Sequence, residues 1–223
     1  MRCPFNHLLL ATENTEFDAG AELVAIELAN RCGIPLHAVR PLVSNPEYES
    51  LAPEREEQAE AEAAMKMAQL QQRAEAQGVA LDGSIRLGEE PFREIVEEAR
   101  ERRADMVVLR RREKHSYLAN LLLGEMVHTV TGHAPCDVLV VPRAARLWSR
   151  GIVLATDGSP HSDRATTVAA SFAAAFDLPL TVVSVAEGKD GESAASDNVA
   201  RALGLIGTGA RASGRVVAEG KPY

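Results

Sequence analysis

No stretch of the 223-residue sequence approaches the roughly 20 consecutive apolar residues that span a bilayer. The N-terminus also lacks the apolar segment of a signal peptide, which needs about 7 to 15 residues, because its first apolar run extends only from Leu8 to Ala11. We therefore expect no membrane partner and a cytoplasmic location.

Cysteine is scarce, and basic residues are outnumbered by acidic ones. Cys3, Cys32 and Cys136 are odd in number and irregularly spaced, which fits neither a disulfide framework nor a paired-cysteine zinc site and favours a reducing compartment. Lysine and arginine together number 24 against 32 aspartates and glutamates, so the net charge is -8. Because this charge repels nucleic acid, we expect no nucleic-acid partner.

Patterns of catalytic and metal-binding residues are also missing. Ser159 lies outside any Gly-x-Ser-x-Gly pattern and is followed by proline, which argues against a hydrolase nucleophile. His128 and His133 have no carboxylate or cysteine neighbours at ligand spacing. The sequence therefore predicts neither an enzyme nor a metal site.

The first 143 residues alternate short apolar runs, typical of strands, with segments of helical spacing. The predicted strands are Leu8–Ala11, Leu36–Val39, Ile85–Leu87, Met106–Leu109 and Val138–Val141. The predicted helices follow Thr15, which forms a capping-box pattern with Asp18, follow Pro53, and begin at Pro91 and near Gly124. This alternation predicts an α/β fold with a parallel sheet between two layers of helices.

Two expectations concern burial. Helical spacing places Phe17, Ala21, Val24 and Leu28 on the inner face of the first helix. The runs at 106–109 and 138–141 are continuously apolar, so we expect both strands to be buried on both faces.

An internal repeat extends over most of the chain. A shift of 144 residues superposes Leu10–Pro41 on Leu154–Val185 without a gap, which favours duplication over accidental similarity. The match resumes where Gly88–Phe92 is echoed by Gly220–Tyr223. We therefore predict a complete domain over 1-144, a linker over 145-150, and an incomplete second copy over 151-223 with only three strands. A fragment of a longer gene product is the open alternative.

Four stretches together resemble the universal stress protein family. They are His7–Thr15, Ala104–Leu109, His133–Pro142 and Ile152–Ser159. The resemblance covers residues 6 to 143 and, in part, 151 to 223, so the chain is similar to a tandem universal stress protein. It implies a doubly wound five-stranded parallel sheet of strand order 3-2-1-4-5, an adenine nucleotide alpha hydrolase-like fold, followed by a partial second copy.

The resemblance also implies a nucleotide cleft. In nucleotide-binding members, an acidic residue after the first strand faces the nucleoside and the end of the second strand bonds adenine through its backbone. A loop of pattern Gly-x2-Gly-x9-Gly-Ser/Thr wraps the phosphates, where glycine lets backbone N–H groups approach closely. The matching or flanking residues in the first copy are Ala11, Thr12, Glu13, Pro41, Arg110, Arg111, Lys114, Gly124, Glu125 and Met126.

The first copy departs from this pattern. Glu13 replaces aspartate, and Pro41 has no backbone N–H to donate. Gly124 is kept but is followed by Glu125, whose charge would repel a phosphate about 4 Å away by on the order of 1 to 4 kcal/mol. The loop glycines are replaced, depending on a one-residue shift, by Arg110 and Glu113 or by Arg111 and Lys114. We expect side chains to occupy this site.

Two alternatives concern phosphate binding. The basic residues at 110–112, 114 and 115 either bind phosphate through their side chains or are simply solvated, and solvation is the simpler interpretation. The second copy keeps the family pattern at Ala155, Thr156, Asp157 and Val185, but the sequence has no counterpart of its phosphate loop.

These patterns predict a non-enzymatic universal stress protein that acts in stress response or regulation through protein association. We expect no cofactor and no ATP binding of the usual kind. The alternative is an adenine-nucleotide-binding stress regulator or weak ATPase that takes ATP or AMP.

Two expectations concern partners. The resemblance implies pairing through the fifth strand, so we expect a homodimer with an isologous contact at Asp137–Val141, besides an unidentified protein partner. In the second copy, the strand at Ile152–Ala155 lacks a neighbour on one side. We expect another chain or the first copy to cover that edge, or the second half to be poorly ordered.

Overall fold

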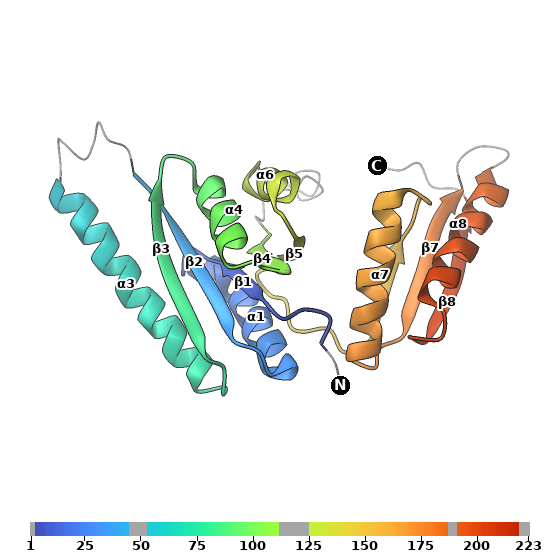
Figure 1. Cartoon of the computed structure of the whole chain (residues 1–223), viewed down its shortest axis with the longest axis horizontal. Helices are drawn as coiled ribbons and strands as arrows, with labels where there is room; N and C mark the ends of the chain where they lie inside the picture. The colour runs from blue at the N-terminus through green and yellow to red at the C-terminus, as the bar shows by residue number, and fades with distance from the viewer. Residues whose placement is uncertain (1–2, 45–52, 112–124, 187–190, 219–223) are drawn as a thin grey trace. The chain divides into compact units, whose positions relative to one another are not determined.

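The computed structural model describes residues 3–44, 53–111, 125–186 and 191–218 (Figure 1). The chain forms two compact units: an N-terminal unit, Phe5–Leu147, and a C-terminal unit, Trp148–Tyr223 with Met1–Pro4. The division falls inside the predicted linker 145-150, while residues 1–4 group with the second unit.

The N-terminal unit contains a five-stranded parallel sheet in the order β3-β2-β1-β4-β5, which confirms the expected topology. The strands are β1 (Leu8–Ala11), β2 (Leu36–Val43), β3 (Leu81–Gly88), β4 (Met106–Arg110) and β5 (Asp137–Val141). The helices are α1 (Ala19–Cys32), α3 (Pro53–Glu75), α4 (Pro91–Glu101) and α6 (Glu125–His133), with a 3-10 turn η1 (Glu16–Asp18) before α1. Figure 1 shows α1 and α3 on one face of this sheet and α4 and α6 on the other.

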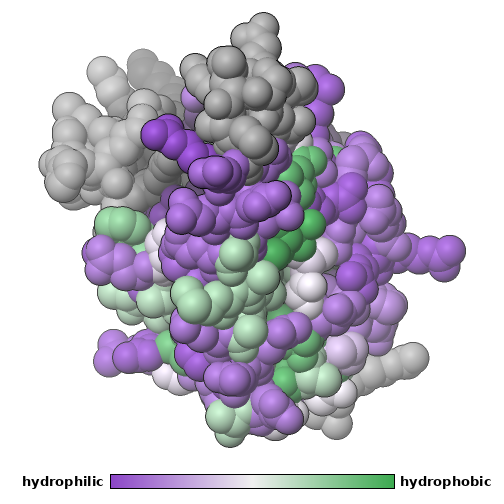
Figure 2. Space-filling view, turned by 90° about the vertical axis from the view of Figure 1, so that its left-hand side faces the viewer, coloured by the Kyte–Doolittle hydropathy of each residue, from purple (hydrophilic) through white to green (hydrophobic). Residues whose placement is uncertain are grey.

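Local sequence sets the ends of these elements. The predicted capping box is present, since Asp18 Oδ2 accepts hydrogen bonds from the Thr15 N–H at 2.9 Å and the Thr15 hydroxyl at 2.6 Å. Helix α1 ends at Gly33, whose φ of 63° is left-handed. Helix α3 buries Ala63 and Leu70 as its spacing predicts, and its outer side is largely hydrophilic (Figure 2).

Burial follows the predictions in the centre of the sheet but not at its edge. Every residue of β1 is buried, whereas Val141 is the only fully buried residue of β5. The continuous apolar run misled here because β5 is an edge strand. The prediction for Phe17 is also wrong: Phe17 is 49% exposed in η1, and the Arg143 guanidinium lies 4.8 Å from its ring centre.

Cysteine pairing differs from the expectation. Cys136 is a free thiol, but Cys3 and Cys32 are disulfide-bonded, so the inference that the cysteines form no disulfide is wrong.

Of the helices that the structure describes, none is long and apolar enough to cross a membrane. The cytoplasmic location stays a prediction.

The C-terminal unit repeats the first half of this topology. Its three-stranded parallel sheet has the order β6-β7-β8, which corresponds to β1-β2-β3. The elements are β6 (Ile152–Ala155), α7 (Pro160–Ala175), β7 (Leu180–Ala186), α8 (Gly191–Ile206) and β8 (Ala212–Ala218). The three strands expected of the incomplete second copy are therefore present.

Helix α1 passes very close to the chain that follows β5. A Cβ atom on Gly20 would lie 2.2 Å from the carbonyl oxygen of Pro142 and 2.6 Å from that of Arg143, far inside van der Waals contact. Only glycine fits this crossing. The repeat places Arg164 at the equivalent position of α7.

We predict that Gly20→Ala destabilises the protein by about 1 to 3 kcal/mol, because the backbone must shift to admit the methyl group. This loss should outweigh the gain in helix propensity. Gly132→Ala in α6 is the matched control, since no atom lies within 4 Å of a Cβ built there. Urea unfolding followed by circular dichroism measures both variants, and equal stabilities would contradict the close crossing.

Candidate functional site

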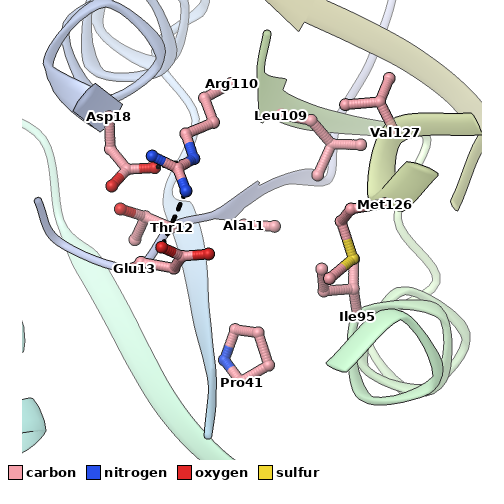
Figure 3. Close-up of a pocket in the computed structure, with 10 residues that line it drawn as sticks. All are labelled: Ala11, Thr12, Glu13, Asp18, Pro41, Ile95, Leu109, Arg110, Met126 and Val127. Atoms are coloured by element: carbon pink, nitrogen blue, oxygen red, sulfur yellow. Dashed lines mark hydrogen bonds and ion pairs between the residues drawn. The ribbon is translucent and has the colours of Figure 1, made fainter. Parts of the chain in front are cut away.

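A small cavity of about 60 Å³, partly open to solvent, lies at the carboxyl ends of β1, β2 and β4 in the N-terminal unit. In an open parallel sheet, ligands usually bind at this point, where the strand order reverses. The lining residues, drawn in Figure 3, are Ala11, Thr12, Glu13, Asp18, Pro41, Ile95, Leu109, Arg110, Met126 and Val127.

The structure brings together most of the residues predicted for the first copy. Those that line the cavity are Ala11, Thr12, Glu13, Pro41, Arg110 and Met126. Arg111 does not line it, and its backbone N–H donates to the carbonyl oxygen of Val141 at 2.7 Å. Glu125 is exposed in the first turn of α6 and does not line it either. Lys114 and Gly124 lie outside the described residues.

Sequence analysis missed four lining residues: Asp18, Ile95, Leu109 and Val127. Asp18 and Leu109 have other roles that the sequence did predict, in the capping box and at the end of a strand. Because one local role explained each residue fully, nothing in the pattern signalled a second role in the cavity.

Arg110 occupies the polar end of the cavity. Figure 3 shows its guanidinium group between Asp18 and Glu13. Arg110 Nη2 donates to Glu13 Oε2 at 2.8 Å, and Arg110 Nε lies 3.4 Å from Asp18 Oδ1. Asp18 is 1% exposed and its Oδ1 accepts no hydrogen bond, so the ion pair with Arg110 is what compensates this buried oxygen.

The remaining cavity wall suits neither phosphate nor a backbone contact to adenine. One guanidinium faces two carboxylates, which leaves this end with a net negative charge that repels phosphate. Pro41 supplies no N–H. The other walls are apolar, including Ile95 from α4 and Leu109 from β4. Arg110, and not Glu125, is the side chain that lies at the polar end of the cavity.

A buried carboxylate fixes the turn that carries Glu13. Glu22 of α1 accepts hydrogen bonds from Thr12 Oγ1 at 2.9 Å, Asn14 Nδ2 at 3.1 Å and Arg73 Nη2 at 2.6 Å. Asn14 has a left-handed φ of 53°. These bonds hold the turn after β1 and so keep Glu13 within reach of Arg110.

Ion pairs hold α4 over the edge of the sheet beside the cavity. Arg86 of β3 lies 2.8 Å from carboxylate oxygens of Glu98 and Glu101 and 3.0 Å from that of Glu94. Hydrogen bonds to Glu101, Glu98 and Glu94 raise the pKa of Arg86. Burial works to raise the pKa of Glu98, but hydrogen bonds from Arg86, Ser84 and Arg102 outweigh it and lower that pKa. Helix α4 is therefore fixed by charge as well as by apolar packing.

The predicted residues of the second copy also meet. Ala155, Thr156, Asp157 and Val185 line an open hollow of about 710 Å³ at the ends of β6 and β7. Hydrogen bonds from the Ser159 hydroxyl and backbone N–H lower the pKa of Asp157 to about 2. Asp157 is thus ionised and bound within its own turn. Over the described ranges, no group of three or more His, Cys, Asp or Glu side chains is placed to hold a metal ion.

Several solved structures share this fold. A universal stress protein from Archaeoglobus fulgidus DSM 4304 has 16% identity and a TM-score of 0.74, covering 96% of this chain and 77% of that one. UspA from Lactobacillus plantarum has 24% identity and a TM-score of 0.53, covering 63% of this chain and 99% of that one. A universal stress protein in complex with cAMP has 20% identity and a TM-score of 0.51, with coverage of 63% and 99%.

Comparison of sequences gives the family. No curated protein sequence matches the chain significantly. The model of the universal stress protein family matches residues 4–142 and 149–205, one segment for each copy of the repeat. The chain therefore belongs to the universal stress protein family, as a tandem member with a partial second sheet.

Proposed function

We propose that this universal stress protein acts through association with other proteins, without catalysis and without binding ATP in the manner of nucleotide-binding members. The observation that carries the proposal is the position of Arg110 in the cleft, where it contacts Glu13 and the buried Asp18. The cleft of the first copy is thereby occupied by the protein's own side chain.

Opening this cleft has a cost. A nucleotide whose phosphates entered between β1 and β4 would have to draw Arg110 away from Asp18. Asp18 is almost completely buried and would keep an uncompensated charge. Leaving a buried polar group unsatisfied costs about 1 to 3 kcal/mol, and more for a charged group, and the adenine contact at Pro41 offers no N–H in return.

The alternative is an adenine-nucleotide-binding stress regulator or weak ATPase. Two observations favour it. Ala155, Thr156, Asp157 and Val185 keep the family pattern and line one hollow, and a family relative was solved in complex with cAMP. Both are compatible with nucleotide binding at the second copy.

We predict that ATP and AMP do not raise the melting temperature of the purified protein and that native mass spectrometry finds no bound adenine nucleotide. The reason is that Glu13 and the buried Asp18 hold Arg110 at the polar end of the first cleft. A stoichiometric nucleotide would overturn the proposal. If Arg111→Ala and Lys114→Ala then abolished its binding, the basic residues of the loop would be the phosphate site.

A double-mutant cycle tests the ion pair itself. Arg110→Met should lower the free energy of unfolding by about 1 to 3 kcal/mol, because Asp18 loses its compensating charge. Asp18→Asn keeps the acceptor of the capping box but removes the charge, so the double variant should recover most of the loss. Additive losses in urea unfolding would show that Arg110 does not compensate Asp18.

For association, we propose a homodimer through β5. Within the described residues, β5 pairs only with β4 and forms the sheet edge. An unpaired strand edge is a ready template for another strand, and β5 of a second copy would complete an isologous contact.

We predict that light scattering after size exclusion gives twice the 23.9 kDa chain mass for the wild type. Leu139→Lys should give the single-chain mass, because an added charge at a strand edge opposes pairing. The matched control is Val43→Lys at the end of β2, where the side chain is 71% exposed. Circular dichroism verifies that each variant is folded, and a monomeric wild type would rule out this dimer.

A further inference from the structure

Among the described elements, helices cover only one face of the sheet in the C-terminal unit. Leu154, Leu180 and Val182 pack against residues of both α7 and α8. Because successive strand residues point to opposite faces, the alternate positions lie on the other side. We call them the open face: Val153, Ala155, Thr181, Val183, Val185, Ser213, Arg215 and Val217.

The open face exposes apolar side chains. Val153 is 73% exposed, Val185 is 46% exposed and Val217 is 42% exposed. Val185 and Val217 are direct neighbours in the ladder between β7 and β8. Contiguous apolar surface of this kind marks an interaction site.

The internal repeat shows what covers such a face. The shift of 144 residues pairs Val153 with Leu9 and Val183 with Val39. In the N-terminal unit, Leu9 and Val39 are completely buried, in one core cluster with residues of α4 and α6. The equivalent surface is therefore one that a helix covers.

The strand register identifies a charge that such a helix must meet. Ser84 lies opposite Val39, and Arg215 lies opposite Val183, so Arg215 is the counterpart of Ser84. Ser84 Oγ donates to a carboxylate oxygen of Glu98 in α4 at 2.8 Å. A guanidinium at that position suits a carboxylate on the covering helix.

We propose that the open face binds an amphipathic helix of a partner protein, in the way that α4 lies on its own sheet. An apolar stripe at i, i+3 and i+4 covers Val153 and Val183, and a carboxylate pairs with Arg215. This inference rests on the proposed function of protein association and gives the chemistry of the partner.

A second copy of the open face does not fit as well. None of the eight residues of the open face is acidic. Pairing two open faces would give neither Arg215 an opposite charge. A helix with one acidic side chain satisfies both the apolar and the charged parts of the surface.

The test uses the 223-residue chain and a labelled peptide with the sequence of residues 90–103, which contains α4. Fluorescence anisotropy should show saturable binding of the peptide. Val153→Asp should weaken it at least tenfold, because it places a charge against the apolar stripe. Arg215→Glu should weaken it several-fold, and a peptide carrying Glu98→Lys should restore that loss.

The matched control is Leu205→Asp, since Leu205 is 53% exposed on α8 and lies outside the open face. It should leave peptide binding unchanged. Absence of saturable binding, or binding insensitive to Val153→Asp and Arg215→Glu, would overturn the inference. A self-association that Val153→Asp abolishes, without peptide binding, would also overturn it and make a second copy the occupant.

Failure here is distinguishable from failure of the proposed function. Neither the nucleotide test nor the β5 test needs the peptide, and the β5 test concerns the N-terminal unit alone. A bound nucleotide would remove the proposed function whatever the peptide does, whereas an inert open face would leave the cleft and the β5 dimer unaffected.

Discussion

A parallel sheet needs cover on both of its faces, and the two halves of this chain meet that requirement to different degrees. In the N-terminal unit, helices on both sides bury β1 and β4 almost completely. The cavity exists because α4 and α6 lie over the ends of these strands. In the C-terminal unit, α7 and α8 bury one face only, and valines of the same strands are exposed on the other.

The covered sheet also explains the chemistry of the cleft. Asp18, directly before α1, is 1% exposed, and a buried carboxylate needs a compensating cation. Arg110, the last residue of β4, supplies it from inside the cavity. The ion pair therefore places a charged group at the end of the cavity between β1 and β4.

Much of the fold was predictable from the sequence because its signals are local. Apolar runs predicted the central strands, the pattern of Thr15 and Asp18 predicted the capping box before α1, and the repeat predicted the three strands of the second sheet. The burial of β5 and of Phe17 was predicted wrongly, because a continuous apolar run does not distinguish an edge strand from a central one and because helical spacing does not show where Arg143 lies. The disulfide-bonded state of Cys3 and Cys32 likewise depends on positions far apart in sequence.

The sequence predicted which residues line the site better than it predicted the contacts between them. Glu13, Pro41 and Arg110 were identified, and all three line the cavity. Asp18, the buried partner of Arg110, was not identified as a site residue, because its role in the capping box already explained it. A residue that makes both a local and a long-range contact shows only the local pattern in the sequence. Its long-range contact becomes visible only in the folded structure.

The close approach at Gly20 makes the two copies differ in whether a further strand could be added beside their first helix. At Gly20, the backbone of α1 packs directly against the backbone of the segment that follows β5. At the same place on α7 stands Arg164, whose long side chain would have to move aside before any segment could cross there. The two copies are related by the internal repeat, but their first helices no longer present the same surface. A β5 segment grafted onto the second copy would meet Arg164 where the first copy has Gly20.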